Sequence, residues 1–546
     1  MKSGRLIPLL CMGFSVFYCM TSVQAGIPVW SFTQDPDFPA RTFVSSTGVA
    51  TVKYIVTNNS RLSHHLFLSP QIGVSQIGEC LLAPKNMPDS SCTLELTING
   101  SMLPGSGLST GPVMCESANP NECYRPGPAD LLSVTKVQNG SILTASTTNL
   151  ALSIKGLTLN SFASGAPRVI TITNNGDAPA TGLSVTIPAW PAGTSSISTC
   201  GSSLAPGASC TITVTPGVVA TSGVGNTPCT NGTAPIPGVV SVTASNAVQT
   251  SNTNVVVLGY GCIYQGGFVY AMTETADPSE SIGGSVVSTS DQAGGALGNN
   301  IFTAEYNGGV VWSSNGLTGH QTPPGTIDTD DVSHDRIPGI DQLSTPLIPD
   351  PSFANFLATF VSTYSNPNPF TSQSFQACQG NSDGKCNTDN ILVFYNTFIT
   401  NYTCPPGGPP CNPVLPFVAS PGPTPLNYYA AGLCKTNING YTDWYLPAIC
   451  EMGQADDASC SINTPNIFNN LPALIGDTGT SCSLGVNCIA GIYWSSTEME
   501  LPGSSPQRNS WAWFYASANS GPAPSIFSLA SKYRLYGVRC TRALTV

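Results

Sequence analysis

The chain has 546 residues, only 9% of them charged, and its 29 acidic side chains outnumber 18 basic ones, giving a formal net charge of −11. Its 54 Gly, 46 Pro and 20 Cys are typical of exported β-rich modules with many turns, and four His are few for a catalytic protein of this size. The length predicts two to four domains, and the acidic balance predicts no nucleic-acid partner.

The first 25 residues have the pattern of a secretory signal. Lys2 and Arg5 precede an apolar run from Leu6 to Tyr18, which is short for a bilayer span, and Val23-Gln24-Ala25 is a small-residue cleavage site. No later run predicts a transmembrane segment. Cleavage leaves 16 basic against 29 acidic side chains, a net charge of −13. We therefore expect export through the Sec pathway, to the cell surface or the medium.

Cleavage also leaves 18 cysteines, an even number that predicts disulfides in an oxidising compartment. No CxxC pair is present, which argues against redox or metal chemistry. Spacing predicts seven local pairs, Cys80–Cys92, Cys115–Cys123, Cys200–Cys210, Cys378–Cys386, Cys404–Cys411, Cys450–Cys460 and Cys482–Cys488. The cysteines that remain are paired as Cys434–Cys540 and Cys229–Cys262.

Residues 26–150 and 151–261 contain an internal repeat. The alternating segment 52–60 matches 169–176, and each ends in an Asn-rich turn. The segments that follow Cys80 and Cys200 also match, each leading through a second Cys into another alternating strand. This pattern predicts two Ig-like β-sandwiches, and it resembles the bacterial relatives of abnormal-spindle/Hydin-type Ig domains, which commonly act as spacers. We interpret His64-His65, beside the first turn, as an exposed pair.

Residues 262–546 form the third predicted domain, and its middle contains two acidic turns. The first holds Asp328, Asp330 and Asp331, and the second holds Asp383, with Asp389 close behind. Carboxylates on a bending loop are ligands that Ca²⁺ prefers, although acidic loops are more often simply solvated. The sequence therefore establishes no cofactor, and Ca²⁺ is the one candidate. A helix is predicted over 388–400, with Asn387 or Thr388 as its cap.

The last hundred residues contain three phrases that are rich in aromatic and turn residues, at 440–447, 493–498 and 536–540. The first predicts a short strand that enters a helix, the second a buried strand, and the third a final strand over 538–540. Between them, the alternation of 511–516 places Trp511, Trp513 and Tyr515 on one face of a strand.

These phrases resemble the Lcl C-terminal domain family of bacterial surface proteins. The family pattern of an Ala-rich helix with a Cys, a DWRLP-like turn, a YWSSTE-like strand, an aromatic strand and a terminal VRC matches segments 429–434, 443–447, 493–498, 511–515 and 538–540. Upstream, 263–270 is similar to the opening hairpin of longer members, and 288–292 and 310–312 to their next strands, so the resemblance covers roughly residues 260–546. Tyr445 departs from the pattern, since shorter members usually carry Arg. The resemblance implies a C-type-lectin-like domain that binds glycans or proteins.

The predicted fold class is therefore mainly β with an α+β C-terminal domain: two Ig-like β-sandwiches followed by a C-type-lectin-like domain. The predicted function is extracellular recognition or adhesion, in which the last domain binds a glycan or a host or surface protein. Candidate ligand-binding residues are Trp511, Trp513, Tyr515, Lys532 and Arg534. The net charge favours a neutral glycan or a protein surface, whereas a local patch of Lys532, Arg534, Arg539 and Arg542 would favour heparin-like chains.

Two other classes of function remain open. The chain contains no GxSxG, HExxH, Walker or GxGxxG motif, so it is not expected to be an enzyme of those classes. An enzyme resembling the formylglycine-generating enzymes, which share a lectin-like architecture and use a reactive Cys, is one alternative. A structural surface protein without a soluble ligand is the other.

Overall fold

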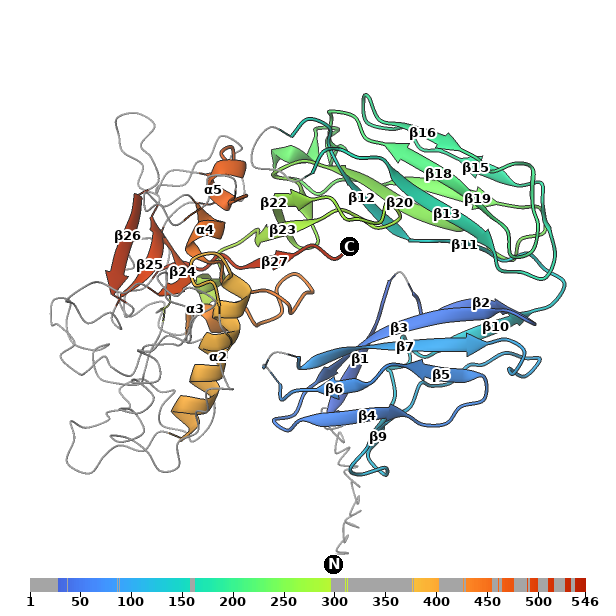
Figure 1. Cartoon of the computed structure of the whole chain (residues 1–546), viewed down its shortest axis with the longest axis horizontal. Coiled ribbons are helices and arrows are strands. Elements are labelled where there is room, and N and C mark those ends of the chain that lie inside the picture. The colour runs from blue at the N-terminus through green and yellow to red at the C-terminus, as the bar shows by residue number, and fades with distance from the viewer. Residues whose placement is uncertain are drawn as a thin grey trace, which may run out of the picture.

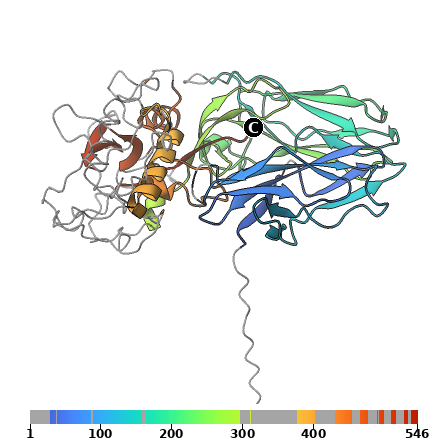
Figure 2. The same ribbon diagram turned by 60° about the horizontal axis from the view of Figure 1, so that its bottom comes forward.

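The computed structural model describes residues 28–36, 38–85, 87, 89–157, 163–295, 310, 312, 376, 378–401, 426, 429–453, 460, 464–475, 489, 492–498, 509–514, 526–531 and 536–546. Over these residues the chain is mainly β, with a C-terminal α+β part. The two N-terminal units lie side by side, and the C-terminal part lies against one end of them (Figures 1 and 2). Among the described residues, no helix has the length and apolar character that a membrane span requires.

The first unit is a β-sandwich. One of its sheets has the order β1-β3-β7-β5, formed by Trp30–Gln34, Val49–Asn58, Ser91–Asn99 and Val74–Ile77. A second sheet has the order β6-β4-β8-β9, formed by Cys80–Leu82, His64–Leu68, Met114–Glu116 and Cys123–Tyr124. β2 (Arg41–Ser45) and β10 (Ser133–Val137) pair in parallel. Alternate residues of β3 and β7 are buried, as the period of two requires, and they pack with Trp30 and Tyr54 in the core.

The second unit repeats the order of the first sheet, whereas its other strands pair differently from those of the first unit. One sheet is β11-β13-β18-β16, formed by Leu143–Ala145, Arg168–Asn174, Ser209–Thr215 and Ser195–Ser198. The other is β12-β20-β19-β15, formed by Asn149–Ser153, Ser251–Leu258, Gly238–Thr243 and Ser184–Thr186. The short strands β14 (Ala180–Thr181) and β17 (Ser203–Leu204) also pair. The strand order is that of an Ig-like sandwich in which the first strand is shared between the two sheets. Because β11 and β12 belong to this unit, it begins before residue 151, the predicted boundary.

The repeated Asn-rich turns have the same structure in both sandwiches. Asn58 donates to the carbonyl of Leu62, and its side-chain oxygen accepts the N–H of Ser60. Asn174 makes the same pair of contacts with Ala178 and Gly176. Each Asn therefore satisfies backbone groups that the turn leaves without strand partners. The match extends the sequence repeat to individual hydrogen bonds.

Seven of the nine pairs expected from the sequence are disulfides in the structure. They are Cys80–Cys92, Cys115–Cys123, Cys200–Cys210, Cys229–Cys262, Cys378–Cys386, Cys434–Cys540 and Cys450–Cys460. The other two expected pairs, Cys404–Cys411 and Cys482–Cys488, lie outside the described residues. The chain is thus a disulfide-rich β protein, which indicates that it folds in an oxidising compartment.

The C-terminal part combines two small sheets with short helices. One sheet has the order β21-β22-β23-β27, formed by Ile263–Tyr264, Gly267–Thr273, Gly283–Ser288 and Thr541–Ala543. The other has the order β24-β25-β26, formed by Ile492–Glu498, Asn509–Phe514 and Ile526–Ser531. The helices are α2 (Gly384–Asn401), α3 (Ala430–Leu433), α4 (Ile449–Met452) and α5 (Ile467–Asn470), together with the 3-10 turn η2 (Gln292–Gly295). A further 3-10 turn, η1 (Cys229–Asn231), belongs to the second sandwich. The chain end, in β27, closes the sheet that begins at residue 263.

Two expected element boundaries were wrong. Helix α2 begins at Gly384, four residues before the predicted start, because the Asp383 carboxylate accepts the N–H of Cys386 and so acts as the cap. The final strand is β27, whereas the predicted segment 538–540 precedes it. The ladder with β23 runs over Thr541–Ala543, and of the predicted segment Cys540 joins it through its carbonyl, which accepts the N–H of Ser288.

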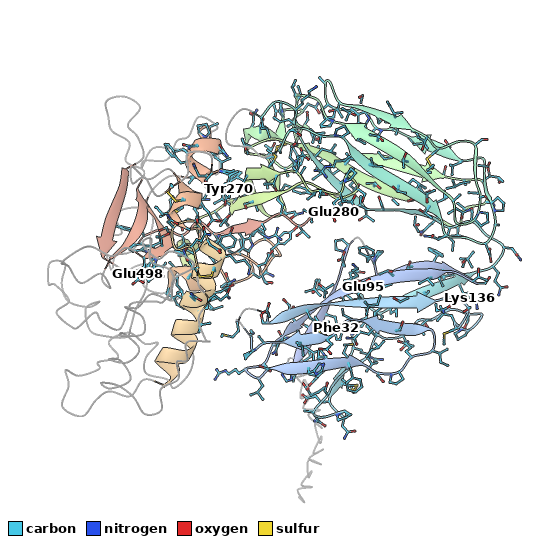
Figure 3. The ribbon with its side chains drawn as sticks, viewed as in Figure 1. Phe32, Glu95, Lys136, Tyr270, Glu280 and Glu498 are labelled. Carbon is cyan, nitrogen blue, oxygen red and sulfur yellow. A yellow bond between two sulfur atoms is a disulfide. The ribbon has the colours of Figure 1, made fainter. Side chains whose placement is uncertain are left out.

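The second sandwich and the C-terminal part share one hydrophobic core. Val256 and Leu258 of β20 pack in the same cluster as Trp444 and Trp494. The Cys229–Cys262 disulfide joins the two parts, and buried Arg168 of β13 forms an ion pair with Glu274. Figure 3 labels Glu280 where the two parts meet, and next to it the Ser281 hydroxyl accepts the N–H of Ala151. These contacts make the two parts one packed unit.

Candidate functional site

The three C-terminal phrases meet in space. Tyr493 forms a bridge with Gly537, and Tyr445 forms one with Thr541. The N–H of Ser496 donates to the carbonyl of Pro447, at 2.8 Å. The phrases are far apart in the sequence, yet each one supplies backbone partners to another. They form the centre of the C-terminal α+β part.

The tryptophans of this centre are core residues. Trp494 is fully buried, and its Nε1 donates to the carbonyl of Val310 at 2.8 Å. In the opposite direction, Nε1 of Trp312 donates to the carbonyl of Ser495 at 2.7 Å. A buried indole with a satisfied N–H cannot stack on a sugar. The phrase 493–498 therefore builds the domain and leaves Trp494 unavailable to a ligand.

In the last phrase, 536–540, Gly537 lies close to the carboxyl group of Asp291. A Cβ at Gly537 would lie 2.5 Å from Asp291 Oδ2 and 2.8 Å from the ring of Tyr493. Asp291 Oδ1 accepts the N–H groups of Val538 and Ala293. Burial raises the pKa of Asp291 above its usual value, although these hydrogen bonds oppose the shift. Gly537 is needed because the chain must pass close to this carboxyl group.

Glu451 joins three segments of the same centre. One of its carboxyl oxygens accepts the N–H groups of Gly384 and Ala448, at 3.2 and 2.8 Å, and the other accepts the hydroxyl of Tyr445 at 2.9 Å. The residue reaches the surface in part, but its carboxyl group is enclosed. Burial raises the pKa of Glu451 to about 7, with a smaller contribution from the charge of Asp383. Tyr445, the departure from the family pattern, thus has a structural partner.

Arg539 and Arg542, which the alternative reading placed in a basic patch, are both buried. The Arg542 guanidinium donates to both carboxylate oxygens of Asp443, at 2.7 and 2.8 Å, and lies 4.0 Å from the centre of the Tyr441 ring. Arg539 donates to the carbonyl of Ser288. Two of the four cations proposed for a heparin site are therefore occupied inside the domain, which corrects that alternative.

Most of the predicted ligand and metal residues lie outside the described part of the chain. Trp511 and Trp513 are on β25, but their side chains are not described, and Tyr515, Lys532, Arg534, Asp328, Asp330 and Asp331 lie outside the described residues. The second acidic turn is described: Asp383 caps α2, and Asp389 pairs with Lys385 and Lys435 at 3.4 and 3.2 Å. Among the described residues, no three His, Cys, Asp or Glu side chains gather as a metal site would require.

His64 and His65 are not an exposed pair, contrary to the sequence interpretation. The His64 side chain is only 9% exposed and is hydrogen-bonded at both ring nitrogens, to Ser60 and Glu116. Only His65 faces solvent. The alternation of β4 explains the difference, because consecutive residues of a strand point to opposite faces.

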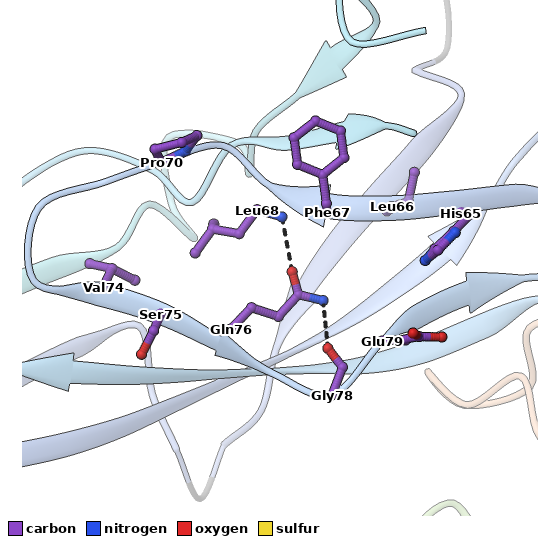
Figure 4. Close-up of a pocket in the computed structure, with 10 residues that line it drawn as sticks. All are labelled: His65, Leu66, Phe67, Leu68, Pro70, Val74, Ser75, Gln76, Gly78 and Glu79. Carbon is purple, nitrogen blue, oxygen red and sulfur yellow. Dashed lines mark hydrogen bonds between the residues drawn. The ribbon is translucent and has the colours of Figure 1, made fainter. Parts of the chain in front are cut away.

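A pocket of about 380 Å³ lies between β4 and β5 of the first sandwich (Figure 4). The Gln76 side chain spans it, accepting the N–H of Leu68 at 2.9 Å and donating to the carbonyl of Gly78 at 3.0 Å. Gln76 thus satisfies strand-edge groups that no neighbouring strand reaches. The pocket walls are mainly apolar, with Phe67 and Pro70 among them.

A larger groove of about 540 Å³ lies between the two sandwiches. Its walls combine aromatic, hydroxyl and amide groups, including Phe43, Ser146, Asn175 and Asn252. The Ser46 hydroxyl donates to Asp177 across the boundary, at 2.9 Å, which links the two walls. Aromatic faces beside hydroxyl and amide groups, with Arg41 on the same wall, suit a polar ligand.

No protein-family model matches the chain, and no curated protein matches it. Similar solved structures include a protein of unknown function from Porphyromonas gingivalis W83, with 13% identity, a TM-score of 0.16, and coverage of 42% of this chain and 99% of that one. Domains 4–9 of the surface layer protein SbsC match with 8% identity, a TM-score of 0.20, and coverage of 42% and 31%. Dpr2 Ig1-Ig2, in complex with DIP-Theta Ig1-Ig3, matches with 10% identity, a TM-score of 0.14, and coverage of 42% and 99%. At these TM-scores the likenesses support no argument about function.

Proposed function

We propose that the chain is an exported recognition protein, whose C-terminal α+β domain binds a glycan or a protein surface outside the cell. The observation that supports this proposal is the shared core of the second sandwich and the C-terminal domain. A disulfide and the ion pair of buried Arg168 with Glu274 fix the two parts together, so a ligand-binding surface on the domain would be held at a defined orientation. The resemblance to the Lcl C-terminal domain family, and through it to C-type lectins, is part of the same proposal.

The alternative of a cysteine-dependent enzyme needs a free thiol in the C-terminal domain. Seven of its cysteines are in disulfides, Cys262 among them through its bond to Cys229, and the four others, Cys404, Cys411, Cys482 and Cys488, lie outside the described residues. Mass mapping of the non-reduced protein decides the point. Recognition predicts that all four are paired, whereas a free thiol among them would favour the enzyme.

The proposed ligand is neutral or a protein surface, because the mature chain has a net charge of −13 and two of the four candidate cations are buried. Long-range repulsion opposes the approach of a sulfated glycan at low salt. Binding should therefore change little between about 50 and 300 mM salt, since few ion pairs would be screened.

Heparin binding across this salt range tests the proposal, with the wild type compared with the double variant Lys532→Ala, Arg534→Ala. The matched control is Lys53→Ala with Lys85→Ala, which removes the same charge from the first sandwich. We expect weak heparin binding that neither pair of substitutions alters. Strong binding that salt weakens and that only the Lys532/Arg534 variant loses would show that a local patch outweighs the net charge.

A further inference from the structure

Three side chains of the first sandwich form a hydrogen-bonded chain that has no counterpart in the second. Ser60 Oγ lies 2.6 Å from His64 Nε2, and His64 Nδ1 lies 2.6 Å from Glu116 Oε2. This is the order of nucleophile, base and acid that activates a serine. We propose that Ser60, His64 and Glu116 form a hydrolytic site for small esters that reach it from solvent.

Glu116 is placed to hold the imidazole in the required tautomer. Its Oε1 also accepts the N–H groups of His65 and Ala118, at 3.4 and 3.3 Å. Burial raises the pKa of Glu116, but the hydrogen bonds from His64, Ala118 and His65 outweigh it and hold the pKa below its usual value. A carboxylate can only accept, so Nδ1 of His64 carries the proton. In neutral His64, Nε2 is then free to accept the proton of the Ser60 hydroxyl.

Ser60 lies at the surface end of this chain. It is half-buried, and the residues that follow it, Arg61, Leu62 and Ser63, are exposed. The backbone N–H and the carbonyl oxygen of Leu62 each lie 3.2 Å from Ser60 Oγ, so the turn itself holds the Ser60 side chain in place. The N–H of Arg61 has no acceptor among the described residues. The N–H of the residue after a nucleophilic serine is a recurring donor to the developing oxyanion.

The second sandwich shows that the Asn-rich turn forms without these three hydrogen-bonded side chains. Asn174 repeats the contacts of Asn58, and the positions of Ser60 and His64 are taken there by Gly176 and Ala180. Ala180 pairs with Leu204 as His64 pairs with Leu82. Neither Gly nor Ala has a polar side chain. The hydroxyl and the imidazole are thus additions to a turn whose fold does not require them.

The proposed reaction balances with water as its only co-reactant. Ser60 Oγ attacks the ester carbonyl carbon as its proton passes to His64 Nε2, and Glu116 stabilises the imidazolium that forms. The C–O bond to the alcohol breaks, and the alkoxide takes the proton from Nε2. Water then attacks the acyl-serine, giving its proton to Nε2, and this proton returns to Ser60 Oγ as the carboxylic acid leaves.

Two measurements on the full mature chain test the site: hydrolysis of 4-nitrophenyl acetate, and labelling by a fluorophosphonate located by peptide mass mapping. We expect the label on Ser60, and at least a tenfold loss of hydrolysis in Ser60→Ala. His64→Ala copies the residue found in the second sandwich and should fold, with a similar loss. Ser63→Ala removes an exposed hydroxyl of the same turn and should keep the wild-type rate.

The proposal is overturned if the wild type hydrolyses the ester no faster than Ser60→Ala, or if the fluorophosphonate leaves Ser60 unlabelled. Thermal unfolding of each variant separates loss of chemistry from loss of fold. If His64→Ala does not fold, the Ser60→Ala result alone decides the test. We expect Ser60→Ala to fold, because Ser60 is half-buried and Gly at the equivalent position makes the same turn.

Discussion

Glu451 makes the stability of the C-terminal domain sensitive to pH. Its carboxyl group is enclosed and its pKa is raised to about 7, from an ordinary value of 4.5. A raised pKa means that the folded state holds the proton more tightly than the unfolded chain. The stability contribution is therefore complete below pH 4.5 and is lost as the pH rises through 7, amounting to about 3 kcal/mol at most.

Glu451→Gln tests this linkage, because Gln keeps the size of the side chain but cannot ionise. We expect the free energy of unfolding of the wild type to fall between pH 5 and pH 8 by more than that of the variant. Calorimetric unfolding at both pH values measures the difference. Glu95→Gln, which removes a carboxylate paired with Lys53 on the first sandwich, is the matched control. Equal pH dependence in the wild type and Glu451→Gln would contradict the assignment.

Arg542 should be important for stability, because it is buried and has a full set of partners. Arg542→Met removes two charge-assisted hydrogen bonds to Asp443 and a cation–π contact with Tyr441. Since Asp443 is 54% exposed and can be rehydrated, we expect a loss of about 2 kcal/mol, below the roughly 3–5 kcal/mol that breaking a fully buried ion pair costs. Arg542→Lys, which keeps the charge but loses the planar fork, should recover only part of it. Denaturant unfolding of both variants checks the order.

At the scale of elements, the longest disulfide loop should matter most. Cys434–Cys540 spans 106 residues and ties α3 to the strand that closes the sheet, whereas Cys378–Cys386 spans 8. The chain-entropy model gives about 5 kcal/mol for the first loop and about 2.5 for the second. Replacing each pair by Ala should therefore lower the unfolding midpoint more for Cys434/Cys540. A larger effect of the Cys378/Cys386 pair would show that local packing outweighs loop closure.

The sequence predicted the strands better than the contacts between them. Alternation located β3, β13, β18 and β25, and cysteine spacing predicted disulfides that the structure contains. Periodicity, however, reports only which residues are buried. It does not show that Trp494 bonds to Val310, or that Arg542 bonds to Asp443, because those partners come from distant segments. The phrases stood out in the sequence because they build the core of the domain.

The hydrogen-bonded group of Ser60, His64 and Glu116 was missed for a similar reason. Ser60 and His64 are close in the sequence, but Glu116 lies 52 residues beyond His64 and reaches it only when β8 pairs with β4. The comparison of the two repeats held a usable signal, since Ser and His in the first replace Gly and Ala in the second. A polar pair at positions where the repeat has small residues favours a role beyond folding.

At the scale of the whole molecule, the shared core determines which fragments of the chain can fold. A fragment that begins at residue 261 would expose the apolar surface that Ala151, Val256 and Leu258 now cover. Residues 138–546 keep the second sandwich, with β11 and β12, together with the C-terminal domain. We expect this fragment to fold and to unfold in one transition, because burial of a common core makes the two parts cooperative. Two separated calorimetric transitions would contradict this expectation.

The most direct test of the proposed function compares residues 26–546 and 138–546 on one panel of immobilised glycans and extracellular-matrix proteins, with and without Ca²⁺. The proposal predicts at least one ligand, bound with the same affinity by both proteins. Binding that only residues 26–546 retain would place recognition in the first sandwich or in the groove between the sandwiches. That result, or no binding by either folded protein, would contradict recognition by the C-terminal domain.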